Sequence, residues 1–439
     1  MADFENAEIE EEKEAEIELS KVYRFPEDVV IRKYGSAYLA IYTKGISWLV
    51  LESDKELRVF QLLRGGHSIE EVLNSADEDD VIKVITQIEA KNFEHPITNE
   101  RTDRNIYIYL TNNCNERCRH CYMFAGDVKF TELTPEQWMG VIDDFSENGG
   151  TGITFTGGEV TVYRGFDRVI RHAHEAGVKV TVLSNGIQWK KELICDLSPC
   201  IDEIQISIDG YDAESYYKVR RFDGFARAIQ CVEDFCECGT KVSVAATPLY
   251  DDLPDFVAKF EPFARSLMKK HPEVHIKLNL ELIPGREVHA TPEENRQYRQ
   301  MLRDLVERLY HDYYIKSYVL NYENHILKRN CGFGEISLAA DGRVFWCSRI
   351  HELKSSMNVL ETGFRELFAK SDEIRESTSV DNTAGCRDCD VRYICGGGCR
   401  IKYQGIKDAE THAGEWEYAC EGKDRIYDRM IRSNRYFFE

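Results

Sequence analysis

The middle of the chain alternates short apolar runs with stretches in which apolar residues recur every three or four positions. The runs have the length of buried strands, and the stretches between them have the period of amphipathic helices. Six strand–helix units in succession predict a parallel sheet, with ligands at the carboxyl ends of its strands. The strand candidates are Ile106–Leu110, Ile153–Phe155, Val178–Leu183, Glu203–Ile208, Val242–Ala246 and Val274–Leu280.

The first hundred residues follow a different pattern, in which three alternating runs precede three helical stretches. The runs cover 28–31, 37–42 and 47–51, and Gly residues mark the turns between them. In the second helical stretch, Ser68 and Glu71 have the spacing of a capping box. Three strands and three helices outline a winged-helix domain over residues 21–98.

The remaining segments lack such periodicity. Residues 1–20 contain nine acidic residues and one Lys, which predicts a solvated acidic tail. We expect the α/β unit to cover residues 104–315. From 320 to 439 the chain is irregular and rich in Gly and Cys, which is typical of chain held together by metal rather than by an apolar core.

Charge and composition exclude several kinds of partner. The chain has 439 residues and a net charge of −21, and a field of that sign repels nucleic acid. No apolar run approaches the roughly 18 residues of a membrane span, and the acidic start is unlike a secretion signal. We therefore expect a cytoplasmic protein with no nucleic acid and no membrane partner. Because thiols stay reduced in the cytoplasm, its 15 Cys indicate metal binding rather than disulfides.

Cys114, Cys118 and Cys121 follow the first strand of the α/β unit directly, with the spacing C-x3-C-x2-C. Three thiolates on one short loop do not complete a tetrahedral zinc site by themselves. They suit one face of an iron–sulfur cubane, with the fourth iron open to another ligand. The alternative is a zinc knuckle or incidental thiols.

This motif resembles that of the radical S-adenosylmethionine (SAM) superfamily. The resemblance implies a partial (βα)6 TIM-like barrel in which the three Cys hold a [4Fe–4S] cluster and SAM binds the fourth iron. In that family, SAM is cleaved to methionine and a 5′-deoxyadenosyl radical, which takes a hydrogen atom from the substrate. Further marks lie at the ends of successive strands, where Thr156 precedes two glycines and a glutamate. The implied SAM contacts are His120, Tyr122, Gly157, Gly158, Glu159, Ser184, Asn185, Ser207, Asp209 and Arg220 or Arg221.

Seven cysteines in the last third of the chain resemble the SPASM domain of peptide-modifying radical SAM enzymes, with a zinc ribbon as the alternative. The resemblance implies two auxiliary [4Fe–4S] clusters, and so three clusters in all. The outer cluster would take Cys386, Cys389, Cys395 and Cys420, and the inner one Cys331, Cys347 and Cys399. Two cubanes need eight ligands, and Ser337 stands near the position of the eighth Cys in some relatives. One iron of the inner cluster is therefore expected to be open, or held by another side chain or by the substrate.

Five cysteines remain outside both motifs. They lie in or beside helical stretches, and we expect them to be buried small apolar residues or spare thiols. These are Cys195, Cys200, Cys231, Cys236 and Cys238.

The arrangement of residues 21–98 resembles the PqqD-like RiPP recognition element, which binds leader peptides of ribosomally made, post-translationally modified peptides (RiPPs). The segments 38–42, 48–51 and 63–72 carry the resemblance. It implies that a leader adds a strand to the exposed sheet edge and packs against the third helix. The alternatives are a packing domain and a DNA-binding domain. Ten basic against thirteen acidic residues over 21–98 disfavour DNA.

Together these resemblances imply a radical SAM enzyme that modifies a ribosomal precursor peptide and takes electrons from a donor such as flavodoxin or ferredoxin. The missing eighth thiolate makes a thioether from a substrate Cys to a carbon the leading product. A carbon–carbon cross-link, epimerisation and sulfatase-maturase-like oxidation of one residue are the alternatives. A different class is a non-catalytic iron–sulfur electron carrier or redox sensor. No general acid or base stands out, and the precursor, the residues joined and the oligomeric state are not readable.

Overall fold

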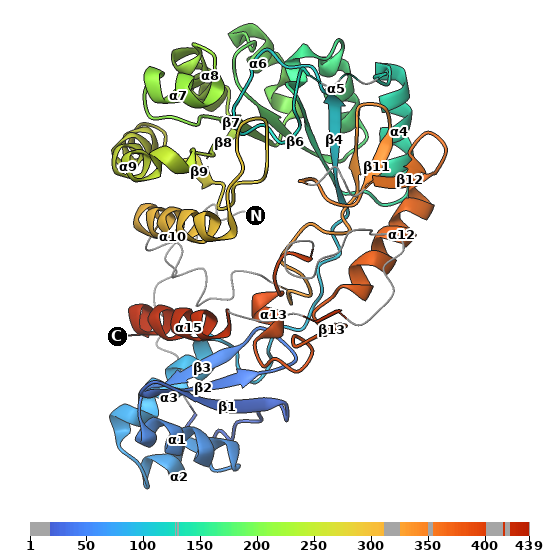
Figure 1. The fold of residues 1–439 in the computed structure, drawn as a ribbon. Helices are drawn as coiled ribbons and strands as arrows, with labels where there is room; N and C mark the ends of the chain where they lie inside the picture. Colours follow the sequence, from blue (N-terminus) through green and yellow to red (C-terminus); the bar gives the residue numbers. More distant parts are fainter. Residues whose placement is uncertain are drawn as a thin grey trace.

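The computed structural model describes residues 18–127, 129, 131–310, 325–349, 354–400, 416–417 and 422–438. A large α/β unit occupies the upper part of the molecule, and the N-terminal sheet and its helices lie at the other end (Figure 1). The C-terminal segment runs between them. None of the described helices combines the length and the apolar character that crossing a membrane requires.

The α/β unit contains the predicted parallel sheet. Its six central strands are β4 (Asn105–Thr111), β5 (Gly152–Gly157), β6 (Lys179–Ser184), β7 (Glu203–Ser207), β8 (Lys241–Ala246) and β9 (His275–Leu278). Each pairs in parallel with the next, so the predicted succession of strands is confirmed. The last strand is shorter than expected, because regular pairing ends at Leu278.

Amphipathic helices connect these strands. They are α4 (Pro135–Glu147), α5 (Phe166–Glu175), α6 (Lys191–Leu197), α7 (Ala213–Arg220), α8 (Phe225–Glu237), α9 (Leu253–Lys270) and α10 (Pro292–Leu309). The first shows why the sequence forms a helix there. Thr134 and Gln137 form a capping box, Pro135 occupies the first turn, and Trp138 and Phe145 are among the side chains it buries. One apolar cluster joins such helices to the strands.

Three short strands that the sequence pattern did not predict extend this sheet beside β4. They are β10 (Ser337–Leu338), β11 (Arg343–Phe345) and β12 (Lys354–Asn358), and they give the nine-stranded order β12-β11-β10-β4-β5-β6-β7-β8-β9. Ser337 of β10 pairs in parallel with Tyr107 of β4. The Cys-rich segment is therefore joined to the first parallel strand, β4, by main-chain pairing.

The N-terminal unit has the predicted elements. Strands β1 (Val29–Tyr34), β2 (Ala37–Tyr42) and β3 (Trp48–Leu51) form an antiparallel sheet, followed by α1 (Asp54–Arg64), α2 (Ile69–Leu73) and α3 (Glu78–Ala90). The capping box of Ser68 and Glu71 is present. The helices bury one face of the sheet in an apolar core of their own.

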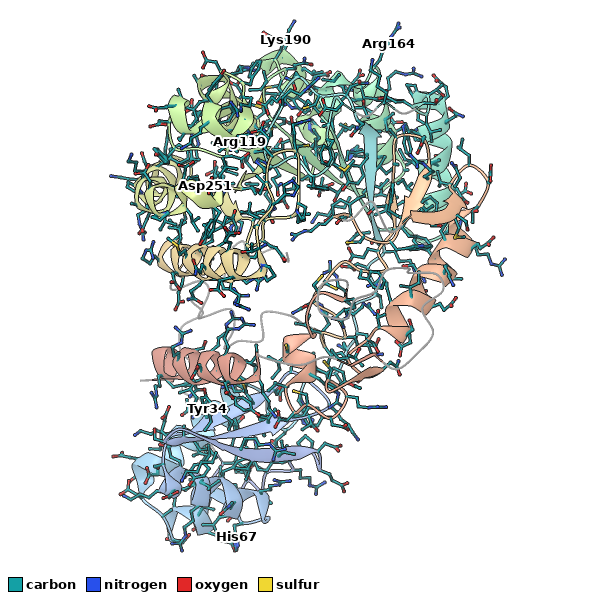
Figure 2. All side chains as sticks on the ribbon, in the orientation of Figure 1. Tyr34, His67, Arg119, Arg164, Lys190 and Asp251 are labelled. Carbon is teal, nitrogen blue, oxygen red and sulfur yellow. A yellow bond between two sulfur atoms is a disulfide. The ribbon has the colours of Figure 1, made fainter. Side chains whose placement is uncertain are left out.

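The other face of this sheet is also buried, by helix α15 (Lys423–Phe438) at the far end of the chain (Figure 1). Leu39 and Val50 belong to this second apolar cluster, with Ile426 and Met430 from the helix. Tyr34, labelled in Figure 2, packs edge to face on Tyr427 at 5.4 Å between ring centroids. The first strands and the last helix of the chain therefore share one core.

The rest of the C-terminal segment packs on both units, with Phe364 in the core of the α/β unit and Val391 in the cluster that the N-terminal sheet shares with α15. It contains α12 (Phe364–Ser377), β13 (Thr383–Ala384), α13 (Arg392–Cys395) and β14 (Trp416–Glu417). Phe364 packs on Phe145 of α4 at 5.1 Å between ring centroids. Cys195 and Cys238 form a disulfide between α6 and the end of α8, so the expectation of spare thiols was wrong for this pair.

Candidate functional site

The three-cysteine loop follows β4 at the carboxyl edge of the parallel strands. Its sulfurs accept main-chain hydrogen bonds, from Glu116 N–H to Cys114 and from Ala125 N–H to Cys121, each at 3.4 Å. Burial raises the pKa of the Cys114 thiol to about 12, so a thiolate at this position requires a bound cation. Soft sulfur donors of this kind fit an iron–sulfur cluster.

Cys114, Cys118 and Cys121 are not in the group of His, Cys and carboxylate side chains that lies close enough to hold a single ion in the part of the chain that the structure describes. The zinc knuckle therefore stays an alternative to a cluster at this loop.

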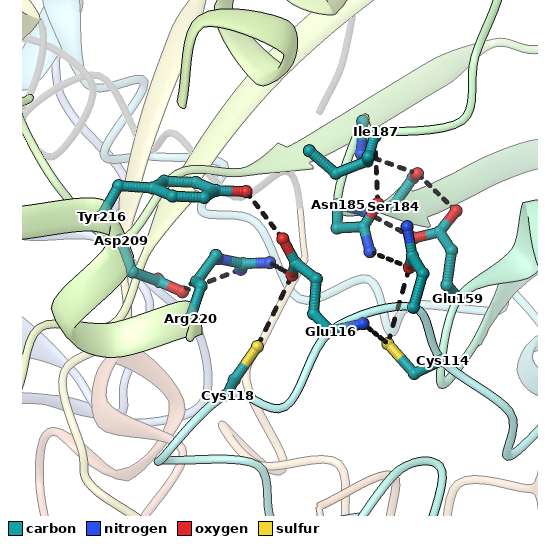
Figure 3. A network of polar contacts seen from close by, with 12 residues as sticks. Cys114, Glu116, Cys118, Glu159, Ser184, Asn185, Ile187, Asp209, Tyr216 and Arg220 are labelled. Carbon is teal, nitrogen blue, oxygen red and sulfur yellow. Dashed lines mark hydrogen bonds and ion pairs between the residues drawn. The ribbon is translucent and has the colours of Figure 1, made fainter. Parts of the chain in front are cut away.

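A buried ion network supports the Cys loop (Figure 3). The Arg220 guanidinium donates to Glu116 Oε2 at 2.7 Å and to Asp209 Oδ2 at 2.8 Å. Tyr216 donates to the other oxygen of Glu116 at 2.9 Å. Arg220 and Asp209 come from the segment after β7, and Glu116 from the Cys loop. Because Arg220 already has two anionic partners, its assignment to the SAM carboxylate stays a prediction.

His120 lies beside this network. Its Nε2 is 3.5 Å from Asp209 Oδ2, and its buried Nδ1 has no hydrogen-bond partner among the described residues. Burial lowers the pKa of His120, which keeps the ring neutral at pH 7. A neutral ring with an unpaired nitrogen, on the Cys loop itself, fits contact with a polar ligand such as adenine.

The two glycines at the end of β5 are required by their contact with the end of β4 and the residues that follow it. A Cβ on Gly157 would lie 2.3 Å from the Thr111 carbonyl oxygen, and one on Gly158 would lie 2.2 Å from that of Asn113. Gly157 also has φ +147°, which favours glycine. The absent side chains therefore let the end of β5 meet the end of β4.

Glu159 joins the ends of β5 and β6 (Figure 3). It accepts hydrogen bonds from Ser184 Oγ and from the Asn185 N–H, both at 2.7 Å. Asn185 in turn donates to Asn115 Oδ1 on the Cys loop at 2.7 Å. Ser184 Oγ also accepts from Trp189 Nε1, so these groups fix the strand ends relative to the cysteines.

The remaining predicted contacts lie on the same edge. Ser207 is the last residue of β7. Asp209 accepts from the Thr247 N–H at 2.6 Å, besides its bond to Arg220. Arg221 is the C-cap of α7 with φ +57°, and it donates to Glu287 at 3.1 Å rather than to the buried network. The roles of these residues toward SAM stay predictions.

Arg286 is a residue that sequence reasoning missed. It lies on the loop after β9 and donates to the carbonyl oxygens of Cys118 and Ala125, both at 2.8 Å. Its Nε donates to Asp127 at 2.9 Å, and its own N–H donates to the Cys121 carbonyl at 3.1 Å. Arg286 therefore holds both halves of the Cys loop.

Neighbours of Arg286 strengthen this clamp. A Cβ on Gly285 would lie 2.5 Å from the His120 carbonyl oxygen, so the two loops touch through main chain. Glu287 accepts from Arg119, labelled in Figure 2, at 2.8 Å. The sequence shows a polar loop after the sixth predicted strand. Nothing in its pattern indicates that this loop contacts the Cys loop.

Two tyrosines connect the Cys loop with the C-terminal segment. Tyr122 donates to the Ser348 carbonyl at 3.3 Å, and Tyr109 of β4 donates to the same oxygen. Because Cys347 directly precedes Ser348, these bonds bring a predicted auxiliary ligand close to the loop of Cys121.

The structure brings the predicted inner-cluster cysteines into neighbouring segments. The Gly334 N–H donates to the Trp346 carbonyl at 2.7 Å, and the Asn330 N–H donates to the Gly396 carbonyl at 3.1 Å. Cys331 therefore lies between the segments of Cys347 and Cys399. Ser337 is fully buried in β10, and its Oγ has no partner among the described residues.

Three of the predicted outer-cluster cysteines lie close together around α13. Cys386 and Cys389 precede the helix, Cys395 is its last residue, and the Cys389 N–H donates to the Cys386 carbonyl at 2.9 Å. Cys420 lies outside the described residues, as do residues 1–17 of the predicted tail.

Comparisons with known proteins agree with this geometry. Residues 108–256 match the family described as the radical SAM superfamily. Sporulation killing factor maturation protein SkfB of Bacillus subtilis is 35% identical over 141 residues, 32% of this chain and 34% of SkfB. The match thus spans about a third of SkfB. Mycofactocin maturase MftC of Mycolicibacterium smegmatis is 28% identical over 310 residues, 66% of this chain and 76% of MftC.

Among solved structures, Streptococcus suis SuiB bound to S-adenosylmethionine has a similar fold. The TM-score is 0.51 at 16% identity, over 89% of this chain and 98% of SuiB. At this identity the likeness concerns the fold alone. Residues 108–256 therefore form a radical SAM domain, and the chain is a homologue of the maturases SkfB and MftC.

Proposed function

We propose that this protein is a radical SAM enzyme that modifies a ribosomally made precursor peptide. The observation that carries the proposal is the Cys loop of a radical SAM domain, fixed at the strand ends by Arg286 and by the Glu116–Arg220 pair. The homologous maturases support a peptide as the substrate class. A structure of SuiB with its precursor peptide SuiA has the same fold, with a TM-score of 0.50 at 15% identity over 88% of this chain and 97% of SuiB.

The cysteines of the loop would hold one [4Fe–4S] cluster, beside which His120 and the ends of β5 to β7 would contact SAM. A bound cluster with SAM supplies a 5′-deoxyadenosyl radical, which abstracts a hydrogen atom from the substrate. The contribution of this chain is to orient the loop. Glu159 and Asp209 do this by connecting separate strand ends through hydrogen bonds.

We assign two further clusters to the C-terminal cysteines. Cys331, Cys347 and Cys399 would hold the inner one, and Cys386, Cys389, Cys395 and Cys420 the outer one. The tyrosine contacts at Ser348 support an inner cluster close to the SAM site. With seven thiolates for eight positions, one inner iron is left for another ligand.

The N-terminal unit would bind the leader of the precursor by adding a strand to its sheet. Strand β3 is the edge next to α3, and there the Gln87 side chain already bonds the outward main-chain groups of Val50. It accepts from the Val50 N–H at 3.0 Å and donates to its carbonyl at 2.8 Å. A leader strand that pairs with this edge would therefore displace the Gln87 side-chain amide from the main-chain groups of Val50.

A thioether from a substrate Cys to a carbon is our leading product. Its formation removes two hydrogens from the peptide. One leaves as an atom to the deoxyadenosyl radical, and the thiol proton goes to solvent. One electron then passes to an acceptor, for which an auxiliary cluster is suited. Carbon–carbon cross-linking, epimerisation and oxidation of a single residue are the alternatives.

Mass spectrometry of a precursor co-expressed under anaerobic conditions tests this function. The candidate is a short peptide encoded beside the gene, alkylated before tandem sequencing. A loss of two hydrogens per link, with one Cys protected from alkylation, supports a thioether. The same loss with every Cys alkylated contradicts the thioether and favours a carbon–carbon link. Deuterium uptake at unchanged mass indicates epimerisation, and no change of any kind contradicts peptide chemistry on that precursor.

A non-catalytic electron carrier or redox sensor is the alternative class. A carrier has no use for SAM and forms no 5′-deoxyadenosine. The paired contacts at five strand ends, from Thr111 of β4 to Thr247 after β8, favour an enzyme, because a carrier needs only the cluster ligands.

A further inference from the structure

Three potential metal ligands meet outside the proposed cluster sites. The ligand atoms of Cys236, His271 and Glu273 all lie within 4.8 Å of one another. Nδ1 of His271 is 3.7 Å from Glu273 Oε1, and the same carboxylate hydrogen-bonds the Cys236 thiol. Tetrahedral ligands about 2.0–2.3 Å from a zinc ion are separated by similar distances.

Different elements bring these side chains together. Cys236 is in the last turn of α8, His271 is the C-cap of α9, and Glu273 lies in the turn before β9. The Val274 N–H closes that turn on the His271 carbonyl at 3.0 Å. This is the end of the barrel where strands begin, and the Cys loop lies at the opposite end. The group therefore belongs to neither SAM nor the C-terminal cysteines.

The surroundings favour a cation. The C-termini of α8 and α9 both end at the group, and the carbonyl groups there carry partial negative charge. Glu233 and Glu237 flank Cys236 on α8, but each is paired with a lysine, Lys270 and Lys191 respectively. Glu273 is the carboxylate left to face Cys236 and His271.

We propose that Cys236, His271 and Glu273 bind one zinc ion, with water as the fourth ligand. A thiolate, an imidazole and a carboxylate are all zinc ligands, whereas calcium and magnesium take oxygen ligands alone. Binding releases the thiol proton to solvent. A bound thiolate and carboxylate together neutralise the two charges of the ion.

Such an ion would join α8, α9 and β9. Strand β9 leads into the loop of Gly285 and Arg286. That loop contacts the Cys loop directly, at the end of the sheet opposite the proposed ion. The proposed zinc would therefore steady the strand that supports this clamp.

The test is zinc content of the full-length protein, purified anaerobically with its iron sites filled and dialysed against micromolar zinc. Elemental analysis should give about one zinc per chain. Zinc K-edge spectroscopy should show one sulfur at about 2.3 Å and nitrogen or oxygen at about 2.0–2.1 Å. Zinc misplaced in a cysteine cluster site would instead show three or four sulfurs, and that result overturns the assignment.

Three variants complete the test. Cys236→Ser and His271→Gln should lower the zinc content at least tenfold while iron content and circular dichroism stay unchanged. Cys200→Ser, which changes another cysteine outside both motifs, should keep the zinc. Wild-type zinc content in the first two variants, or a wild-type protein that binds none, would overturn the proposal. Neither result depends on the proposed enzymatic activity.

Discussion

Arg32 and Asp390 are 358 residues apart in the chain, yet Arg32 Nε donates to Asp390 Oδ2 at 2.6 Å. Asp390 directly follows Cys389, a predicted ligand of the outer cluster. Its other oxygen accepts from Tyr427 and Lys423 of α15, at 2.8 and 2.9 Å. One buried carboxylate thus connects the N-terminal sheet, the cysteine loop and the last helix.

Replacing Asp390 should separate the N-terminal unit from the rest of the protein. Asp390→Asn leaves the buried Tyr427 hydroxyl and the partly exposed Lys423 ammonium poorly paired, and leaving buried polar partners without a good acceptor costs about 1–3 kcal/mol. Arg32→Ala should cost less, at most about 1 kcal/mol, because the Arg32 side chain is 49% exposed. Hydrogen exchange of β1–β3 and α15 measures both effects.

Lys33→Ala is the matched control. The ammonium group of this neighbouring lysine lies over the ring of Tyr38 in the same sheet, 5.2 Å from its centroid. It should leave exchange in α15 unchanged. Equal protection of α15 in the wild type and in Asp390→Asn would show that the carboxylate does not couple the units.

Gln87→Ala should strengthen leader binding. The variant leaves the outward main-chain groups of Val50 unpaired in the free protein, and a leader strand would then pair them without displacing a side chain. A hydrogen bond contributes about 0.5–1.5 kcal/mol, so we expect a several-fold lower Kd. Fluorescence anisotropy with the labelled leader of the candidate precursor gives this value. An unchanged Kd would place the leader elsewhere, for example on the β1 edge.

Arg286→Ala should weaken assembly of the SAM cluster. Hydrogen bonds to charged groups contribute about 1.5–3 kcal/mol each, and this variant removes those to Cys118 and Ala125. We expect less iron per chain and a several-fold smaller SAM-dependent electron paramagnetic resonance signal. Arg164→Ala, at an exposed arginine that projects outward in Figure 2, is the control. Equal signals in both variants would contradict the clamp.

Docking of α15 should depend on pH through Lys91. This buried side chain donates to Asn434 of α15 at 2.7 Å, and burial lowers its pKa to about 7. Its ordinary value is 10.5, so between pH 7 and 10.5 the unfolded chain binds more protons. The free energy of unfolding should therefore rise with pH over this range.

Lys91→Met should remove that rise, because methionine keeps the packing without the charge. The measurement is hydrogen exchange of α3 and α15 at pH 7.5 and 9.5, corrected for intrinsic rates. Identical pH dependence in the variant and the wild type would show that Lys91 is not the titrating group.

Local pattern predicted the main elements of this fold well. The six parallel strands and the N-terminal strands and helices follow from apolar periodicity, and Ser68 and Thr134 show that capping residues mark helix starts. These features depend on residues that are close together in the chain, so they can be predicted from the local sequence pattern.

Long-range pairing was not predictable in the same way. Strand β10 has two residues and no pattern of its own, and it exists because it pairs with Tyr107 of β4. The second buried face of the N-terminal sheet depends on α15, which is almost 400 residues away. Arg286 was missed for the same reason, since its partners lie on a loop that precedes it by more than 150 residues.

The most direct test of the central claim is 5′-deoxyadenosine formation by the reduced, iron-loaded protein with SAM under anaerobic conditions. The control changes Cys114, Cys118 and Cys121 to Ala together. We predict 5′-deoxyadenosine from the native protein alone, in larger amount with the precursor, whose mass then falls by two hydrogens per link. No 5′-deoxyadenosine above the control, with or without peptide, would contradict the account.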